Sequence, residues 1–459
     1  MPDTVIIGGG ISGLAAAYYL AKGGATATML ESRPRLGGVI ETCRVEGCTI
    51  EAGPDSFLSA KPAALDLIQE LGLADQVIGS NDHLRVTFVR RDGRLVPLPD
   101  GLMMMVPTRI VPLLTTSLVG WGTKVKMGME LFRAPKPRTA DQSVSTFIEE
   151  HYGAEAVEYL AEPLLSGVYG GNPDQLSVRS VLPRFVELAT QYGSLTRGVL
   201  AERAKAAKSG ARGEPAPLFR TLKGGLGQMV NAVEAAMEGR IEVRQVRAET
   251  VERVGGGFRV RAGGEWIETA RVVIATEAHS GAGLLGTLDA RLAELLGTVP
   301  YSSSVVIALG FNASDFERPP VGFGFLVPRK ERRVLTACTW VGTKFSYRAA
   351  EGTVVARCFA GGPDKAALLT QSDQSLLDAV TAELQQIAGF RAQPRFHRIF
   401  RWPQAMALYP VGHAERVAEI ESRVALIPGL HLAGNAYQGI GIPDCIRMGK
   451  AAAESILTS

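Results

Sequence analysis

The residues with the clearest chemical meaning are three glycines near the amino terminus. Gly8, Gly10 and Gly13 have the spacing GxGxxG and follow a short apolar run, residues 4–7, that is typical of a buried strand. The first glycine permits a tight turn, the second lets the backbone approach a pyrophosphate, and the third allows a helix to pack closely on the strand. Residues 14–20 favour that helix, whose amino terminus would offer amide donors to phosphate. The combination predicts a dinucleotide-binding unit rather than a structural glycine-rich turn.

The residues that follow favour a flavin dinucleotide over a nicotinamide one. A second strand is expected at residues 27–30 and ends at Glu31, eighteen positions after Gly13. A carboxylate at this place can accept both hydroxyls of an adenosine ribose, and it argues against a 2′-phosphate. Residues 33–38 and 51–56 then form two further glycine-containing turns that expose backbone. A flavin must be enclosed along its whole length and needs such loops, whereas a simple NAD dehydrogenase does not.

The carboxyl terminus repeats the pattern of strand, glycine loop and helix. Residues 431–435 read as a strand ending in a turn, residues 436–446 as a loop, and residues 447–457 as a helix. The helix amino terminus could face the pyrimidine edge of a flavin and stabilise negative charge there. A plain turn between strand and helix is the alternative.

These segments carry a family resemblance that runs nearly from end to end. The terminal segments GGGISGLAAAYYLA, ES, RLGG, EAGPDSFL and LAGNAYQGIGIPDCI resemble the flavin amine-oxidase superfamily, which has the glutathione-reductase type of FAD-binding fold. The central segments SGVYGGN, QLS, GFGFLVP, FRWP and YPVGH are similar to signatures of the oxygen-dependent protoporphyrinogen and coproporphyrinogen oxidases within it.

The resemblance implies two sets of site residues and no metal site. It places the substrate pocket at Arg85, Gly167, Leu326 and Phe359, where apolar walls suit a flat tetrapyrrole and an arginine suits a propionate. The alternatives are ordinary core packing for Leu326 and Phe359 and a solvated hairpin arginine for Arg85. The implied FAD contacts are Gly8, Gly9, Gly10, Ile11, Ser12, Gly13, Glu31, Ser32, Val39, Gly53, Pro54, Asp55, Ser56, Val251, Trp402, Asn435, Ile440, Gly441 and Ile442.

The implied reaction is the six-electron oxidation of a porphyrinogen to a porphyrin in haem biosynthesis. Three hydride transfers from meso carbons to flavin N5 would complete it, and oxygen would reoxidise the flavin and give hydrogen peroxide. No catalytic side chain is expected, because the flavin carries the chemistry. The residues leave open protoporphyrinogen IX, slightly favoured, or coproporphyrinogen III. Another amine oxidase or carotenoid-desaturase-like enzyme is the first alternative, and a non-catalytic flavin-binding subunit is the second.

The order of predicted elements gives an α/β protein with three parts. We expect a Rossmann-like FAD-binding domain assembled from discontinuous segments, a mixed α+β substrate domain, a helical insertion and a surface loop. Their residues are 1–80, 218–297 and 421–459 for the first, 81–99 and 298–420 for the second, 100–207 for the insertion and 208–217 for the loop.

Composition excludes several other classes of protein. The chain has 459 residues, with 49 basic and 46 acidic side chains and no Lys/Arg-rich block, so nucleic-acid binding is not expected. Five cysteines without a CxxC pair predict reduced thiols in a cytoplasmic protein. There is no HExxH zinc motif, GxSxG elbow or complete P-loop in the sequence, which argues against zinc enzymes, serine hydrolases and NTPases.

The same chain offers no apolar run suited to crossing a bilayer, but one region could lie on a membrane surface. The long uncharged runs are interrupted by glycine or proline. Residues 100–132 combine apolar and basic side chains, which predicts peripheral attachment to the inner face of the cell membrane. A buried face or a homodimer contact is an equal alternative. The residues concerned are Met103, Met104, Met105, Val106, Ile110, Leu113, Leu114, Leu118 and Trp121, with Arg109, Lys124 and Lys126.

Overall fold

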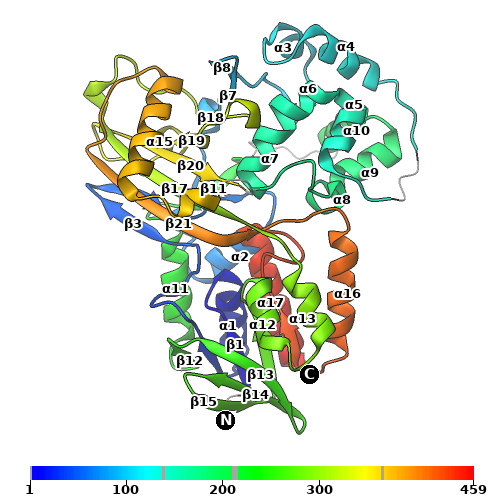
Figure 1. The fold of residues 1–459 in the computed structure, drawn as a ribbon, viewed down its shortest axis with the longest axis vertical. Coiled ribbons are helices and arrows are strands. Elements are labelled where there is room, and N and C mark those ends of the chain that lie inside the picture. Colours follow the sequence, from blue (N-terminus) through cyan, green and yellow to red (C-terminus); the bar gives the residue numbers. More distant parts are fainter. Residues whose placement is uncertain (1–2, 137–139, 209–215, 363–365, 459) are drawn as a thin grey trace.

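The computed structural model describes residues 3–136, 140–208, 216–362 and 366–458. Segments near both ends of the chain contribute strands to one five-stranded parallel sheet, in the lower half of Figure 1. Every residue of its first two strands in sequence is buried, since layers cover both faces, and this explains their continuous apolar runs. In spatial order the strands are β12 (Ile241–Arg244), β2 (Ala27–Leu30), β1 (Thr4–Ile7), β16 (Arg271–Ile274) and β22 (Leu430–Leu432).

Helices cover one face of this sheet and a three-stranded meander covers the other. Ile6 and Met29 share an apolar cluster with α1 (Ile11–Lys22), α11 (Gly227–Met237) and α17 (Ile442–Thr458). The side chains that alternate with them in β1 and β2 belong to a second cluster, which includes the meander. The elements on that side are β13 (Ala248–Val254), β14 (Gly257–Ala262), β15 (Glu265–Thr269), α12 (Ala278–Leu285), α13 (Ala290–Gly297) and α16 (His413–Ala425). The predicted α/β layering is confirmed.

A seven-stranded sheet forms the second part of the molecule. Neighbouring strands are antiparallel except for β18 and β7, which run parallel. Helix α15 (Asp373–Ala388) packs on this sheet. The strand order is β21 (Phe396–Ala407), β17 (Tyr301–Asn312), β20 (Thr353–Gly361), β19 (Leu335–Trp340), β18 (Gly324–Leu326), β7 (Thr87–Arg91) and β8 (Arg94–Pro97).

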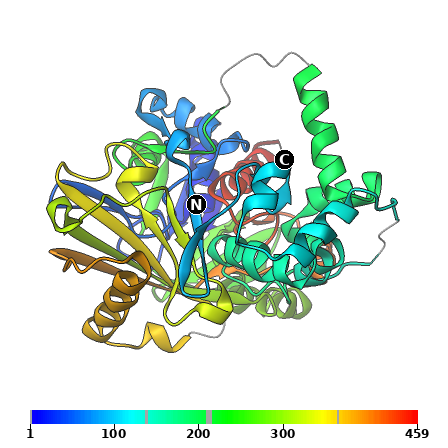
Figure 2. The same ribbon diagram turned by 90° about the horizontal axis from the view of Figure 1, so that it is seen from above.

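A helical part stands on the opposite side of the molecule from this sheet when it is seen from above (Figure 2). Its α7 (Glu162–Tyr169) follows a short π-helical segment, Val157–Ala161. Of the loop predicted at residues 208–217, residues 209–215 lie outside the described residues. The other helices are α3 (Ile110–Thr115), α4 (Trp121–Glu130), α5 (Val144–Tyr152), α6 (Ala154–Ala156), α8 (Val178–Val181), α9 (Pro183–Tyr192) and α10 (Leu195–Lys208).

The membrane-facing surface predicted for residues 100–132 is only partly exposed. Met105, Val106 and Leu118 are fully buried in the core and cannot meet lipid. Lys124 is buried too, and its ammonium group donates to two backbone carbonyls within 2.8 Å, so it is not available to anionic headgroups. Ile110 and the α4 residue Trp121 are exposed as predicted. Among the described residues, no helix is long and apolar enough to cross a membrane.

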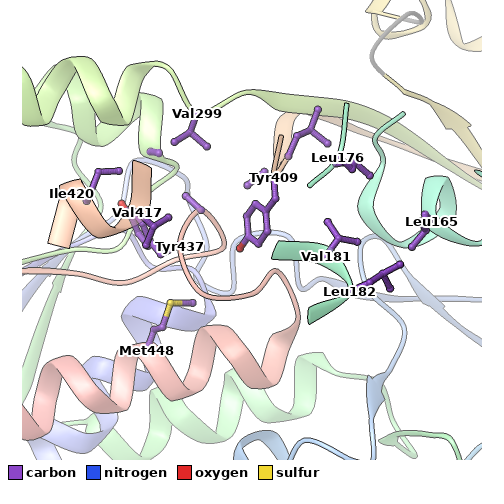
Figure 3. Close-up of a cluster of buried hydrophobic side chains, with 14 of the residues drawn as sticks. Leu165, Leu176, Val181, Leu182, Val299, Tyr409, Val417, Ile420, Tyr437 and Met448 are labelled. Atoms are coloured by element: carbon purple, nitrogen blue, oxygen red, sulfur yellow. The ribbon is translucent and has the colours of Figure 1, made fainter. Parts of the chain in front are cut away.

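One large apolar cluster joins all three parts and fixes their relative positions (Figure 3). Leu165 from α7 and Val181 from α8 reach it from the helical part, and Tyr409 reaches it from the segment after β21. Val417 from α16 and Met448 from α17 complete it from the side of the parallel sheet. Because protein interiors pack as densely as organic crystals, this shared core holds the surfaces between the parts in one arrangement.

Smaller elements fill the junctions between these parts. They include two hairpins, a second small sheet and several short helices. The strands are β3 (Thr42–Val45) with β4 (Cys48–Glu51), β9 (Leu102–Met103) with β10 (Val106–Pro107), and the sheet β5 (Phe57–Leu58), β11 (Phe219–Leu222) and β6 (Val77–Gly79). The short helices are α2 (Ala63–Glu70), α14 (Val341–Lys344), η1 (Ala74–Gln76), η2 (Asp82–Leu84), η4 (Ala313–Asp315), η5 (Arg329–Glu331) and η6 (Ala366–Leu369).

Candidate active site

A cavity of about 1400 Å³ lies where the three parts meet. Its walls include the residues that directly follow β1, β2 and β16, and Gly434 shortly after β22. The cavity therefore sits at the carboxyl ends of the parallel strands, the usual place for a ligand in such a sheet. Pockets for one small ligand measure roughly 300–1000 Å³. This cavity therefore has room for a cofactor and a substrate together.

The glycine loop after β1 is shaped by two close packings and one open space. A Cβ on Gly8 would lie 2.7 Å from the carbonyl oxygen of Ala275, and a Cβ on Gly13 would overlap the carbonyl oxygen of Gly8. A Cβ on Gly10, in contrast, would have nothing within 4 Å. Gly8 thus lets the loop pass close to the end of β16, and Gly13 lets α1 pack against the loop. Gly10 leaves a free space at the amino end of α1 where a diphosphate would fit.

Glu31 is held rigidly at the carboxyl end of β2. Its Oε2 accepts the N–H of Gly9 at 2.7 Å, and its Oε1 accepts the N–H of Arg33 at 2.8 Å. The residue is buried yet lines the cavity. Each carboxylate oxygen has further lone pairs, so Glu31 can also accept ribose hydroxyls, as predicted from its position.

The loop at residues 51–58 is fastened to the seven-stranded sheet. Lys344 contacts Asp55 at 2.9 Å and Arg357 contacts it at 3.4 Å, while Trp402 donates its indole N–H to Ala52 at 2.8 Å. Burial alone would raise the pKa of Asp55, but the two cations hold it well below its usual range. The Asp55 carboxylate of this loop is therefore ionised, and it forms ion pairs with two cations in the cavity wall.

The carboxyl-terminal loop presents a second helix end to the same cavity. Asn435 donates to Ala405 at 2.9 Å, and the Tyr409 hydroxyl donates to the carbonyl of Asn435 at 2.7 Å while accepting the N–H of Gly439 at 2.9 Å. Gly441 and Ile442, at the amino end of α17, line the cavity. Two helix amino termini, from α1 and α17, thus face a space that would suit negative charge.

Three of the four predicted substrate residues line the cavity. Gly167 belongs to α7 and Leu326 to β18, and the two are neighbours in the wall, since a Cβ on Gly167 would lie 3.9 Å from the Leu326 side chain. Phe359, on β20, also lines the cavity, and the Arg357 guanidinium stands 4.7 Å from its ring centre. These three residues are therefore not ordinary core positions, because each faces the cavity. They form an apolar part of the cavity wall, the substrate slot.

Two predicted site residues lie elsewhere. Val251 is fully buried in the core, and residues 246–249 line the cavity instead. Arg85 is exposed and does not line the cavity, because the strand of the hairpin begins only at Thr87, and it is Thr87 that faces the cavity. Gly9 and Gly13 are the other predicted contacts that do not line the cavity. Gly9 packs against Leu36 and Glu31, and Gly13 packs against Gly8.

Sequence reasoning also missed several charged residues of the cavity wall. Lys344 lines the cavity, whereas Arg348, four residues later, is buried against Glu51 at 2.8 Å. Arg329 and Arg332 line the cavity as well. They belong to a run of charged residues that, read alone, is typical of a solvent-exposed turn.

The remaining predicted cofactor contacts are brought together around the cavity. They supply an open space beside a helix amino terminus, a fixed carboxylate after β2 and close backbone passages, the features that a dinucleotide cofactor requires. The residues are Gly8, Gly10, Ile11, Ser12, Glu31, Ser32, Val39, Gly53, Pro54, Asp55, Ser56, Trp402, Asn435, Ile440, Gly441 and Ile442.

Comparison with known proteins agrees with this reading. Residues 11–457 match the family of flavin-containing amine oxidoreductases. The chain is 32% identical to the coproporphyrinogen III oxidase of Bacillus subtilis over 99% of this chain and 97% of that one, and 34% identical to that of Propionibacterium freudenreichii over 99% and 90%. A crystal structure from Exiguobacterium sp. 255-15, provisionally described as a protoporphyrinogen oxidase, superposes with a TM-score of 0.88 at 32% identity, covering 99% of this chain and 98% of the other.

These matches confirm the predicted superfamily and its FAD-binding fold. A flavin cofactor in a dinucleotide-binding fold is FAD, as the glycine loop and Glu31 predicted. The match spans nearly the whole chain, from the start of α1 just after Gly10 to the carboxyl-terminal helix α17. The chain belongs to the flavin-containing amine oxidoreductase family and is an FAD-dependent oxidoreductase.

Proposed function

We propose that this enzyme oxidises a porphyrinogen to a porphyrin in haem biosynthesis, with oxygen as the final electron acceptor and hydrogen peroxide as its product. The observation that carries the proposal is the single cavity with the flavin loops at one side and the slot of Gly167, Leu326 and Phe359 at the other. When bound, FAD supplies the redox chemistry, accepting two electrons in each of three rounds. The names of the relatives support the same substrate class.

The residues of this chain would bind and orient the reactants. The glycine loop and Glu31 would hold the diphosphate and ribose of FAD, and the loop at residues 51–58 would fix its other contacts. The apolar slot would enclose the macrocycle and exclude water, which keeps the reacting meso carbon in one place. No side chain is required to move the proton, because the pyrrole N–H groups become acidic as the carbon is oxidised.

Within this class we propose coproporphyrinogen III as the substrate. It carries four propionates, and an unpaired buried carboxylate costs several kcal/mol, so cations must be near more than one edge of the macrocycle. Lys344 and Arg357 lie on one wall of the cavity and Arg329 and Arg332 on another. The relatives named coproporphyrinogen III oxidase support this choice over protoporphyrinogen IX.

Anaerobic mixing tests the proposal directly. The purified holoenzyme is mixed with coproporphyrinogen III, with protoporphyrinogen IX or with a simple primary amine, and flavin absorbance and porphyrin fluorescence are followed. We expect fast flavin bleaching and porphyrin formation with coproporphyrinogen III and slower change with protoporphyrinogen IX. A flavin that stays oxidised with both porphyrinogens but bleaches with the amine would favour the amine-oxidase alternative. Bleaching with none of the three would favour a non-catalytic flavin-binding subunit.

We also propose that the enzyme is cytoplasmic and attaches to the inner face of the cell membrane through an apolar surface on α3 and α4. Ile110, Trp121 and Phe132 are 72%, 67% and 85% exposed, and Val125 and Met129 are exposed beside them. Exposed apolar side chains in such number on neighbouring helices are typical of a lipid or protein contact. We favour lipid because aromatic and aliphatic side chains are mixed on helices that lie at one end of the molecule (Figure 1).

Flotation with anionic liposomes tests the attachment. The variant Ile110→Ser/Phe132→Ser should lose flotation, whereas Leu426→Ser, which removes an equally exposed leucine after α16, should not. Size-exclusion chromatography with light scattering runs in parallel. A homodimer that the double variant dissociates, together with no flotation of the original protein, would assign this surface to a second copy of the chain and contradict the proposal.

A further inference from the structure

A cationic group in the cavity wall lies on the turn between β18 and β19, away from the flavin loops. Arg329 and Arg332 both line the cavity there. The Arg332 side chain is only 11% exposed, so its charge is largely removed from solvent. A buried charge is stable only when it has hydrogen-bond or ion-pair partners, and the donors that these partners leave unused are the ones that can bind a ligand.

Glu162, at the start of α7, holds this turn in place. Its Oε1 contacts Arg332 Nη2 at 2.8 Å, and its Oε2 accepts the backbone N–H of Arg329 at 3.0 Å. Arg332 also donates through Nε and Nη2 to the carbonyl of Val327, at 3.3 and 3.0 Å, and through Nη2 to the hydroxyl of Ser166 at 3.3 Å. The guanidinium is thus fixed in one orientation before any ligand arrives.

These contacts use only part of the guanidinium. A guanidinium has five N–H donors, and no contact of Nη1 is found among the described residues. The two Nη1 hydrogens are therefore left for a ligand in the cavity. A donor that is already oriented loses little conformational freedom on binding, which favours affinity.

The unused N–H donors of Arg332 favour an anionic acceptor such as a carboxylate, because hydrogen bonds between a guanidinium and a carboxylate are charge-assisted. This part of the wall adjoins the substrate slot, because Ser166 precedes Gly167 and Val327 follows Leu326 in sequence.

We propose that Arg332 forms a binding subsite for one carboxylate of the substrate, with Glu162 as its positioning residue. The inference rests on the proposed function, in which that carboxylate is a propionate of the porphyrinogen. It gives the role that sequence reasoning assigned to Arg85 to a different residue, since Arg85 does not line the cavity.

Equilibrium binding separates this subsite from the general affinity for a flat macrocycle. Coproporphyrin III and its uncharged tetramethyl ester are titrated into the holoenzyme, and Kd is measured by quenching of porphyrin fluorescence. For Arg332→Gln we expect Kd for coproporphyrin III to rise about tenfold or more, as for loss of a hydrogen bond to a charged group, with Kd for the ester unchanged. KM for the porphyrinogen should rise similarly, and kcat should change less.

Two further variants act as controls. Arg333→Gln removes the neighbouring arginine, which is exposed, contacts Gln386 and does not line the cavity, and both Kd values should stay as in the original protein. Glu162→Gln/Arg332→Gln removes the charge together with its counter-charge, so that no unpaired buried carboxylate threatens the fold. Its FAD content and Tm should match the original protein, and its Kd for coproporphyrin III should still be raised.

The outcomes distinguish the subsite from the proposed function. An unchanged Kd and KM in both Arg332 variants, at full FAD content, would overturn the subsite and leave the proposed function standing. Binding that depends on Arg332 in a protein that oxidises no porphyrinogen would support the subsite and contradict the proposed function. If the original protein binds neither porphyrin and oxidises no porphyrinogen, both are wrong.

Discussion

Replacing Gly10 by valine should remove FAD while leaving the folded chain intact. Gly10 has φ −69° and ψ 176°, an extended conformation that any residue adopts, so valine introduces no backbone strain. A Cβ there has nothing within 4 Å, and we expect the free energy of unfolding without cofactor to change by only about 0.5 kcal/mol. The valine side chain would occupy the space at the amino end of α1 that the diphosphate needs.

The size of the effect on the holoenzyme follows from linkage. A cofactor present at a hundred times its Kd stabilises the folded state by about 2.7 kcal/mol, and the variant should lose this stabilisation entirely. Gly13→Ala provides the contrast, because its Cβ would overlap the carbonyl oxygen of Gly8 and separate α1 from the loop. We expect that change to destabilise the protein by about 1–3 kcal/mol even without FAD.

Absorbance of the purified protein and thermal melts with and without added FAD measure these effects. The Gly10→Val protein should be colourless, and its Tm should equal that of the original protein without FAD. Adding FAD should not raise the Tm of the variant. A yellow Gly10→Val protein with full FAD content would refute our placement of the diphosphate. Acid denaturation of the original protein should release free FAD, and flavin that stays on the polypeptide would show a covalent link instead.

Three further predictions concern other parts of the structure. Gly167→Leu should fill cavity space beside Leu326, so that activity with porphyrinogen falls at least tenfold while FAD content stays constant, and unaltered turnover would place the substrate elsewhere. Arg348→Met should lower the free energy of unfolding by about 3–5 kcal/mol in denaturant titrations, since it leaves Glu51 buried without its cation, and a loss below about 1 kcal/mol would contradict this. Burial lowers the pKa of His413 to about 4 from 6.5, so the folded state resists protonation that the unfolded state accepts. The contribution of His413 to the free energy of unfolding should therefore be complete above pH 6.5 and fall by roughly 3 kcal/mol as the pH drops to about 4. His413→Phe, whose ring needs no hydrogen bond, should make the free energy of unfolding less dependent on pH in this range.

The parts of the site that sequence reasoning predicted depend on local structure. The glycine loop and Glu31 belong to one short run of strand, turn and helix, so their spacing along the chain is also their arrangement in space. The carboxyl-terminal loop has the same property. In such units residue type, backbone conformation and function are linked within a few residues, and the sequence contains all of that information.

The errors arose where tertiary structure decides which residue faces the cavity. The strand that holds Val251 has an irregular register between Ala248 and Thr250, which changes which side chains reach the cavity, and no local pattern predicts it. Arg85 precedes its strand because the turn of η2 occupies the residues before it. Arg332 lies in a charged run, and only its packing against Glu162 from a distant helix makes it part of the cavity wall.

The order of the strands in the parallel sheet has a consequence for biosynthesis. β1 leaves the ribosome among the first elements and β22 among the last, yet both border the cofactor cavity. In the nascent chain, the glycine loop is therefore synthesised before its carboxyl-terminal partner and lacks that partner while the intervening sheet and helices form. Contacts between residues so far apart in sequence form slowly. Capture of FAD is thus expected to be a late event that follows synthesis of α17, and free flavin supply at that moment would decide how much of the new protein matures rather than being degraded.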